Sequence, residues 1–349
     1  MMDLKLVRIW TVAAILLGCA ACSNVSRDAA AGLAKQGGDA ASTFATSVSS
    51  TRTDLDNYVE GQILIAPLTG REPPSKSMLH SIDQIKQALS LREQMMAELA
   101  HTYAAFGALA NYDAAGEVNS SLVSLSGSIN SYADTVSPGS GSGTGIAAGE
   151  IGATEVATLI MGEQQSKKIR ATSLLIRVQL KKIVPIMEKE KGTLEAIQKE
   201  IVRGSQQSAL ALWQLGFAQP TPILGEQVGQ LGLTFDPTTY NDQIQKLSKT
   251  DRRMLELAVG SVVKYRAQQQ AQLQAAIIDQ NVDGLKDLIS QHEKLEKGQA
   301  VDLASVTAHI SEMRALVDQL SAASSEATSC PSDGSTPAEG SSHGKHKPK

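Results

Sequence analysis

Glu98 and His101 have the Glu-x-x-His spacing with which four-helix bundles hold a pair of metal ions. A site of that kind needs a second Glu-x-x-His pair and additional glutamates that point into the bundle. The sequence contains no second pair, and both residues lie away from the apolar helix face that passes through Leu99 and Tyr103. We therefore expect a solvated helix face here and predict no metal site and no cofactor.

His292 continues an apolar helical rhythm of steps of four and three residues. The preceding members of that rhythm are Ile278, Val282, Leu285 and Ile289. A histidine on a packed helix face is usually held by hydrogen bonds to its ring nitrogens, so we expect a core residue and not a catalytic one. His80 and His309 lie off their apolar faces, and His343 and His346 lie in a tail that offers a metal no preorganised geometry.

Other chemical motifs are missing or lack their structural context. Residues 143–148, Gly-Thr-Gly-Ile-Ala-Ala, match a degenerate dinucleotide-binding fingerprint by letters alone. That fingerprint requires a preceding β-strand and a βαβ unit, whereas these residues follow a Gly/Ser stretch. The chain has no paired Cys-x-x-Cys motifs and no Walker loop. We predict no catalytic residues and no enzymatic activity.

The N-terminus has the organisation of an export signal. Lys5 and Arg8 form a short basic start, residues 9–17 form an apolar run, and Leu16-Leu17-Gly18-Cys19 follows. Nine apolar residues span only about 14 Å as a helix, which is too short for a bilayer that needs about 20 residues. The segment therefore reads as a signal peptide that is removed and not as a membrane span.

A cysteine directly after Leu-Leu-Gly resembles the lipobox of bacterial lipoproteins, over residues 1 to about 22. The resemblance implies cleavage before Cys19, which then carries lipid such as palmitate on its sulfur and its amine. Cys22 is the weaker candidate because it has no Leu three residues earlier, and plain secretion is the alternative. Ala20 follows the anchor where an Asp would signal inner-membrane retention, so the resemblance favours an outer-membrane anchor facing the periplasm.

Composition favours packed helices and argues against nucleic acid. The chain has 349 residues and 42% hydrophobic content, but only 4 Phe, 2 Trp and 6 Tyr, which suits helices that pack through small and aliphatic side chains. The net charge of −4 offers no electrostatic footprint for nucleic acid. If Cys19 carries the lipid, Cys22 and Cys330 are the remaining cysteines, and whether they form a disulfide bond is left open.

Apolar residues at alternating steps of four and three form heptad seams, which predict long helices. The clearest seam lies between 76 and 112, after a predicted N-cap at Ser75, and Arg92 is its one polar interruption. A helix of that length would be about 55 Å long, so the body must be elongated. We predict an all-α fold, an elongated antiparallel bundle of five or six helices with coiled-coil-like seams. This first seam consists of Met78, Ile82, Ile85, Leu89, Arg92, Met96, Leu99, Tyr103, Phe106 and Ala110.

Later segments repeat this pattern with interruptions. A seam over 176–201 tolerates Pro185, which lies off it, and another seam runs from 303 to 320. Residues 118–136 are Ser-rich and are expected to form a poorly packed helix. Glycines at 37–38, 284 and 298 mark expected breaks.

These signals divide the chain into four parts. Residues 1–18 are the signal peptide, and 19–74 hold the lipidated N-terminus, a first helix and a Pro-containing connection from 61 to 74. Residues 75–320 form the bundle, with a Gly/Ser linker at 137–145, and 321–349 are predicted to be a disordered tail.

The function that needs only these features is a membrane-anchored scaffold, adaptor or binding protein of the bacterial cell envelope. It implies a membrane contact through lipid and an envelope protein partner, with self-association left open. The alternative is a membrane-active protein that inserts residues 145–161, where Gly145, Gly149, Ala153 and Ala157 form a small-residue ridge. Carboxylates at 150 and 155 oppose insertion by about 2 to 4 kcal/mol near the bilayer centre.

Overall fold

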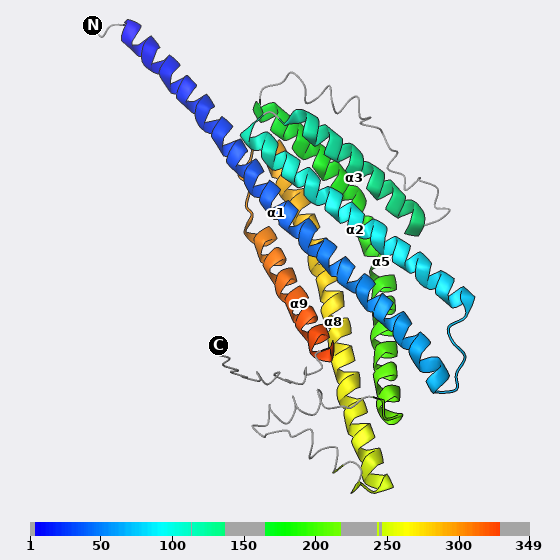
Figure 1. The fold of residues 1–349 in the computed structure, drawn as a ribbon. Helices are drawn as coiled ribbons and strands as arrows, with labels where there is room; N and C mark the ends of the chain where they lie inside the picture. The colour runs from blue at the N-terminus through cyan, green and yellow to red at the C-terminus, as the bar shows by residue number, and fades with distance from the viewer. Residues whose placement is uncertain (1–3, 113, 137–164, 218–242, 244–245, 329–349) are drawn as a thin grey trace, which may run out of the picture.

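In the part of the chain that the structure describes, there are six α-helices and no β-strand (Figure 1). The structure is a computed structural model. It describes the chain except residues 1–3, 113, 137–164, 218–242, 244–245 and 329–349. Among the described residues, side chains are described only from 27 to 321. This architecture confirms the predicted all-α bundle. The Gly/Ser linker at 137–145, the ridge from Gly145 to Ala157 and the segment 145–161 lie outside the described residues.

Helix α1 (Leu4–Leu68) is continuous over 65 residues, about 98 Å at 1.5 Å per residue. The expected break at Gly37-Gly38 is wrong, because the helix passes through both glycines. It also continues into the expected connection, so that the non-helical link to the next helix is shorter than predicted. Of the apolar residues near its end, Ile65 is buried, whereas Ile63 and Leu64 are about half exposed.

Helix α2 (Lys76–Asn111) begins where the sequence predicts. The side chain of Ser75 accepts a hydrogen bond from the backbone N–H of Met78 at 3.2 Å, which satisfies one of the free donors of the first turn. The predicted seam is largely the buried face of this helix. Its fully buried members are Arg92, Met96, Leu99, Tyr103 and Phe106.

Helix α3 (Ala115–Val136) corrects the expectation of a poorly packed helix. Apolar residues recur at helical spacing between its serines, so one face is largely apolar and packs on α2 and α5. The side chains on this face are buried: Val118, Leu122, Leu125, Ile129 and Tyr132.

Helix α5 (Gln165–Gln214) confirms the seam over 176–201 and extends beyond it. Pro185 lies inside the helix without ending it, and its side chain is exposed. Ile176, Leu180, Ile183 and Met187 are buried on the seam. A proline on the solvent side removes one backbone hydrogen bond but disturbs no packed contact.

Helices α8 (Lys249–Glu296) and α9 (Ala304–Thr328) complete the bundle. The expected break at Asp283-Gly284 is wrong, since α8 runs through it, whereas Gly298 has φ of 68° and follows the end of α8 as expected. The seam of α9 is confirmed by its buried residues Val306, Ile310, Met313 and Leu320. Residues 321–328 are helical and not part of a disordered tail.

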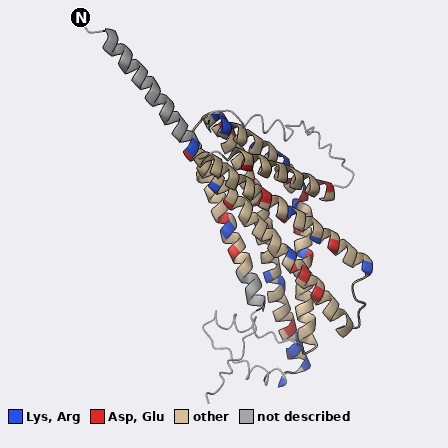
Figure 2. Ribbon diagram, turned by 45° about the horizontal axis from the view of Figure 1, so that its top comes forward, with Lys and Arg blue, Asp and Glu red and all other residues tan. Residues whose placement is uncertain are grey.

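The first helix organises the packing. α1 contacts α2, α5, α8 and α9, while α3 covers α2 and α5 on one side. The helices lie roughly along one long axis, and the N-terminal part of α1 extends past the other helices (Figure 1). Figure 2 shows basic and acidic residues interspersed along the helices, in keeping with a surface of mixed charge.

Candidate functional site

The described residues gather no cluster of three or more His, Cys, Asp or Glu side chains that could hold a metal ion. Glu98 is half-buried and His101 is exposed, so the helix does not point the pair into the core. His343 and His346 lie outside the described residues. Cys19 lies within α1, but its side chain is outside the described part, so the lipidation site stays a prediction.

His292 on α8 is fully buried and hydrogen-bonded, as the sequence predicts. Its Nε2 lies 3.1 Å from the hydroxyl of Tyr103 on α2, and its Nδ1 lies 2.8 Å from Oγ of Ser173 on α5. The imidazole also packs beside the rings of Tyr103 and Phe106, with centroids 5.7 and 5.8 Å away. One side chain therefore joins three helices in the core.

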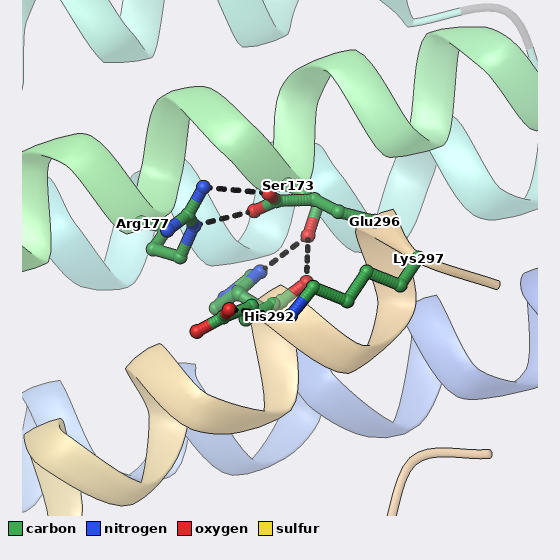
Figure 3. Close-up of polar contacts among 6 residues, drawn as sticks. Ser173, Arg177, His292, Glu296 and Lys297 are labelled. Atoms are coloured by element: carbon green, nitrogen blue, oxygen red, sulfur yellow. Dashed lines mark hydrogen bonds and ion pairs between the residues drawn. The ribbon is translucent and has the colours of Figure 1, made fainter. Parts of the chain in front are cut away.

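The proton positions in this network follow from satisfying every donor. Figure 3 shows Oγ of Ser173 between Nδ1 and the backbone carbonyl of His292. The Ser173 hydroxyl donates to that carbonyl at 3.2 Å, so it must accept from Nδ1–H. Nε2 is then the acceptor for the Tyr103 hydroxyl. Burial, and secondarily the positive charge of Arg177, lower the pKa of His292 to about 3, so the ring is neutral.

The Ser173–His292 contact resembles a nucleophile–base pair but lacks the access that catalysis requires. Both side chains are fully buried, and Tyr103 occupies the second ring nitrogen. No substrate carbonyl can reach Oγ of Ser173 without separating α5 from α8. The arrangement is a buried hydrogen-bond network that links the helices of the bundle. The prediction of a core histidine is confirmed.

A charged pair borders this network on the same two helices. Arg177 on α5 donates from Nε and Nη2 to the two carboxylate oxygens of Glu296 on α8, each at 2.7 Å (Figure 3). Both side chains are about one-sixth exposed. This parallel fork is the strongest geometry for a side-chain ion pair, and it fixes the end of α8 against α5. Lys297, also drawn, pairs locally with Glu293 at 2.6 Å.

A second polar layer surrounds Arg92, the polar interruption in the predicted seam. Its guanidinium carbon lies 4.7 Å from the ring centroid of Phe44 on α1, and its Nη1 lies 3.5 Å from Oε2 of Glu190 on α5. The Tyr132 hydroxyl on α3 donates to that same oxygen. Burial raises the pKa of Glu190, against the lowering effects of Tyr132 and Arg92. Four helices thus meet at one buried cation.

Arg92 and Glu190 lie on separate predicted seams, and neither seam predicts that the two side chains contact each other. Arg92 interrupts the seam of α2, and Glu190 falls on the seam of α5. Buried charges require partners, which is the signal that could have suggested a search for an acid on another helix. The same reasoning applies to the hydroxyl of Tyr103, whose partner is His292.

Neither the apolarity of the helices nor comparison with known proteins points to a further site. Within the described residues, no helix is both long and apolar enough to cross a bilayer. No protein-family model, curated protein or solved structure matches the chain.

Proposed function

We propose that the chain is a bacterial lipoprotein, held through Cys19 at the membrane, whose helical bundle acts as a scaffold, adaptor or binding protein of the cell envelope. The observation that carries the proposal is the N-terminal order of features. A basic start with Lys5 and Arg8, a short apolar run and Leu16-Leu17-Gly18-Cys19 occur together. The resemblance favours the outer membrane, with the bundle in the periplasm.

The geometry of α1 supports a rigid attachment. Cys19 and the bundle belong to the same helix, and Ala30, the first fully buried residue among those whose side chains are described, follows 11 residues later, about 17 Å along a helix. From Cys19 to Leu68 the helix measures about 74 Å. A lipid at Cys19 would therefore hold the far end of the bundle at a fixed height above the membrane, as a scaffold requires.

The far end of the bundle carries accessible apolar side chains. The C-terminal ends of α1 and α5 and the start of α8 all lie opposite the N-terminus (Figure 1). Gln62 ties the first two of these helices together there, donating to Oγ of Ser208 at 3.1 Å. Six large apolar side chains at this end are 47–67% exposed, and they support an adaptor role. Those at this end are Ile63, Leu64, Phe217, Met254, Leu257 and Tyr265.

Fractionation of cells that produce matched cysteine variants tests the anchor. C19S is expected to move the protein from the membrane to the soluble periplasmic fraction, whereas C22S is expected to stay in the membrane. If C19S stayed on the membrane and C22S were released, the lipid anchor would be Cys22 and not Cys19. Retention of both variants would oppose a lipid anchor altogether.

Photo-crosslinking in cells tests the adaptor role. A crosslinker at Leu257, which is 59% exposed at the far end, is expected to give one discrete protein adduct. The control is a crosslinker at Val123, which is 48% exposed on α3 and is expected to give none. Equal adduct patterns at both positions would contradict a specific partner at the far end, and an adduct of twice the chain mass would instead indicate self-association.

Membrane insertion is the competing proposal. Its segment, residues 145–161, lies outside the described residues, and no described contact favours it. Release of a dye from lipid vesicles by the purified protein would support insertion. Vesicles that stay intact would favour the scaffold proposal.

A further inference from the structure

A small cavity lies beside Arg92, between α1, α2, α5 and α8. About 30 Å³ inside it is open to the centre of a water-sized sphere, so it has room for at least one water molecule or small ion. Phe44, against which the guanidinium of Arg92 stacks, forms part of its wall. The full lining is Phe44, Ser47, Val48, Thr51, Leu89, Arg92, Leu194, Gln198, Gln274 and Ile278.

Three donor atoms of the lining have no hydrogen-bond partner within the described chain. They are Nε and Nη2 of Arg92 and Nε2 of Gln274. Arg92 is 1% exposed and Gln274 is 4% exposed, so neither can turn to bulk water. A buried donor without a partner costs about 1–3 kcal/mol, and more when it is charged. These groups therefore favour an acceptor inside the cavity.

The guanidinium of Arg92 is the one charged group in the cavity lining. Carboxyl groups lie next to the lining, since Asp54 is hydrogen-bonded to Gln198. The one acid paired with Arg92, Glu190, sits 3.5 Å from Nη1 and shares its oxygen with the hydroxyl of Tyr132. Arg92 thus uses Nη1 for a long ion pair, and its Nε and Nη2 have no hydrogen-bond partner within the described chain. The ring of Phe44 offsets only part of the charge.

We propose that this cavity binds one small inorganic anion, such as a halide, through Arg92 and Gln274. Oε1 of Gln198, a buried acceptor without a partner, would suit a water instead. Three donors without partners, two of them on the Arg92 guanidinium, outweigh this single acceptor. The bound anion supplies acceptors to Arg92 and Gln274 and stabilises the packing of α1, α2, α5 and α8 around the cavity.

Thermal unfolding of the full chain in detergent tests the site. Sodium bromide is compared with sodium gluconate, the salt of a much larger anion, at constant ionic strength. Bromide is expected to raise Tm by about 2 °C for each tenfold increase above its Kd. Q274L, which removes one donor while keeping similar bulk, is expected to reduce the response, and R92M to abolish it.

A matched arginine controls for general salt effects. Arg52 pairs with Glu93 at 3.0 Å on the surface, so R52M is expected to keep the wild-type response to bromide. Crystals grown in bromide give a second readout that does not depend on a variant folding. An anomalous peak within hydrogen-bond distance of Nε or Nη2 of Arg92 is expected. Identical Tm values in the two salts, or a cavity that holds only water, would overturn the proposal.

Discussion

Gly37 of α1 lies against the ring of Tyr103 of α2 so closely that a Cβ at position 37 would overlap the ring atoms. Tyr103 has little freedom to move away, because its hydroxyl is hydrogen-bonded to His292 in the core. The glycine is therefore required by the approach of two helices and not by a turn. This contact and the histidine network beside it hold α1, α2, α5 and α8 in register.

Replacing Gly37 tests that contact against its neighbour. G37A is expected to lower the free energy of unfolding by about 1–3 kcal/mol, because the methyl group overpacks the interface. At Gly38 a Cβ would lie 3.8 Å from Cβ of Tyr103, an ordinary contact. G38A is therefore expected to stabilise the helix by about 0.5–1 kcal/mol. Urea denaturation measures both, and equal effects would contradict the assigned close approach.

The neutral state of His292 makes stability depend on pH. In the unfolded chain His292 takes up a proton near pH 6.5, but in the folded protein only near pH 3. Between these values the unfolded state binds more protons, so the contribution of His292 to stability falls as pH is lowered. The difference in unfolding free energy between wild type and H292Q is expected to shrink from pH 6.5 to pH 3. A difference that is constant over this range would indicate a histidine that titrates equally in both states.

Asp54 is expected to act in the opposite direction. Burial raises its pKa from 3.8 to about 6, although a hydrogen bond with Gln198 partly offsets this effect. The folded state then binds more protons between these values, so the contribution of Asp54 to stability falls as pH rises through the window. D54N should gain stability relative to wild type between pH 4 and pH 7. D56N, which removes an exposed ion pair with Lys86, provides the control, and a similar gain in D56N would refute the assignment to Asp54.

The forked pair between Arg177 and Glu296 should contribute far more than a surface pair. R177M is expected to lower the unfolding free energy by about 1.5–3 kcal/mol, since it removes two charged hydrogen bonds at a largely buried position. R203M, which removes an exposed contact with Glu200 at 3.4 Å, should change it by about 0.5 kcal/mol or less. R177K should not rescue stability, because an ammonium group cannot form the fork. Denaturation curves with equal midpoints for R177M and R203M would count against this view.

The extent to which sequence predicts this fold depends on whether the signal is local. Periodic apolar residues identify α2, α5 and α9 because burial follows the helical repeat. Glycine is a poor helix former, so the sequence predicts breaks at Gly37 and Gly284, but α1 and α8 continue through both. For Gly37 the reason is its partner Tyr103, 66 positions away, which no local rule reveals.

Only part of the polar core can be predicted from the sequence, for a related reason. His292 falls on an apolar rhythm, so its burial follows from periodicity. Its partners Tyr103 and Ser173 come from two other helices, and their identity depends on helix order and register. The same holds for Arg92 and Glu190. The lipid anchor remains a prediction from residues 1–22, because the side chains of that segment lie outside the described part.

Mass spectrometry of the N-terminal peptide of the native protein tests the central claim most directly. A mature chain that begins at Cys19 and carries the added mass of fatty acyl groups is the predicted result. A peptide that retains Met1 or Met2, with no acyl mass on Cys19, would contradict the lipid anchor and the envelope function built on it.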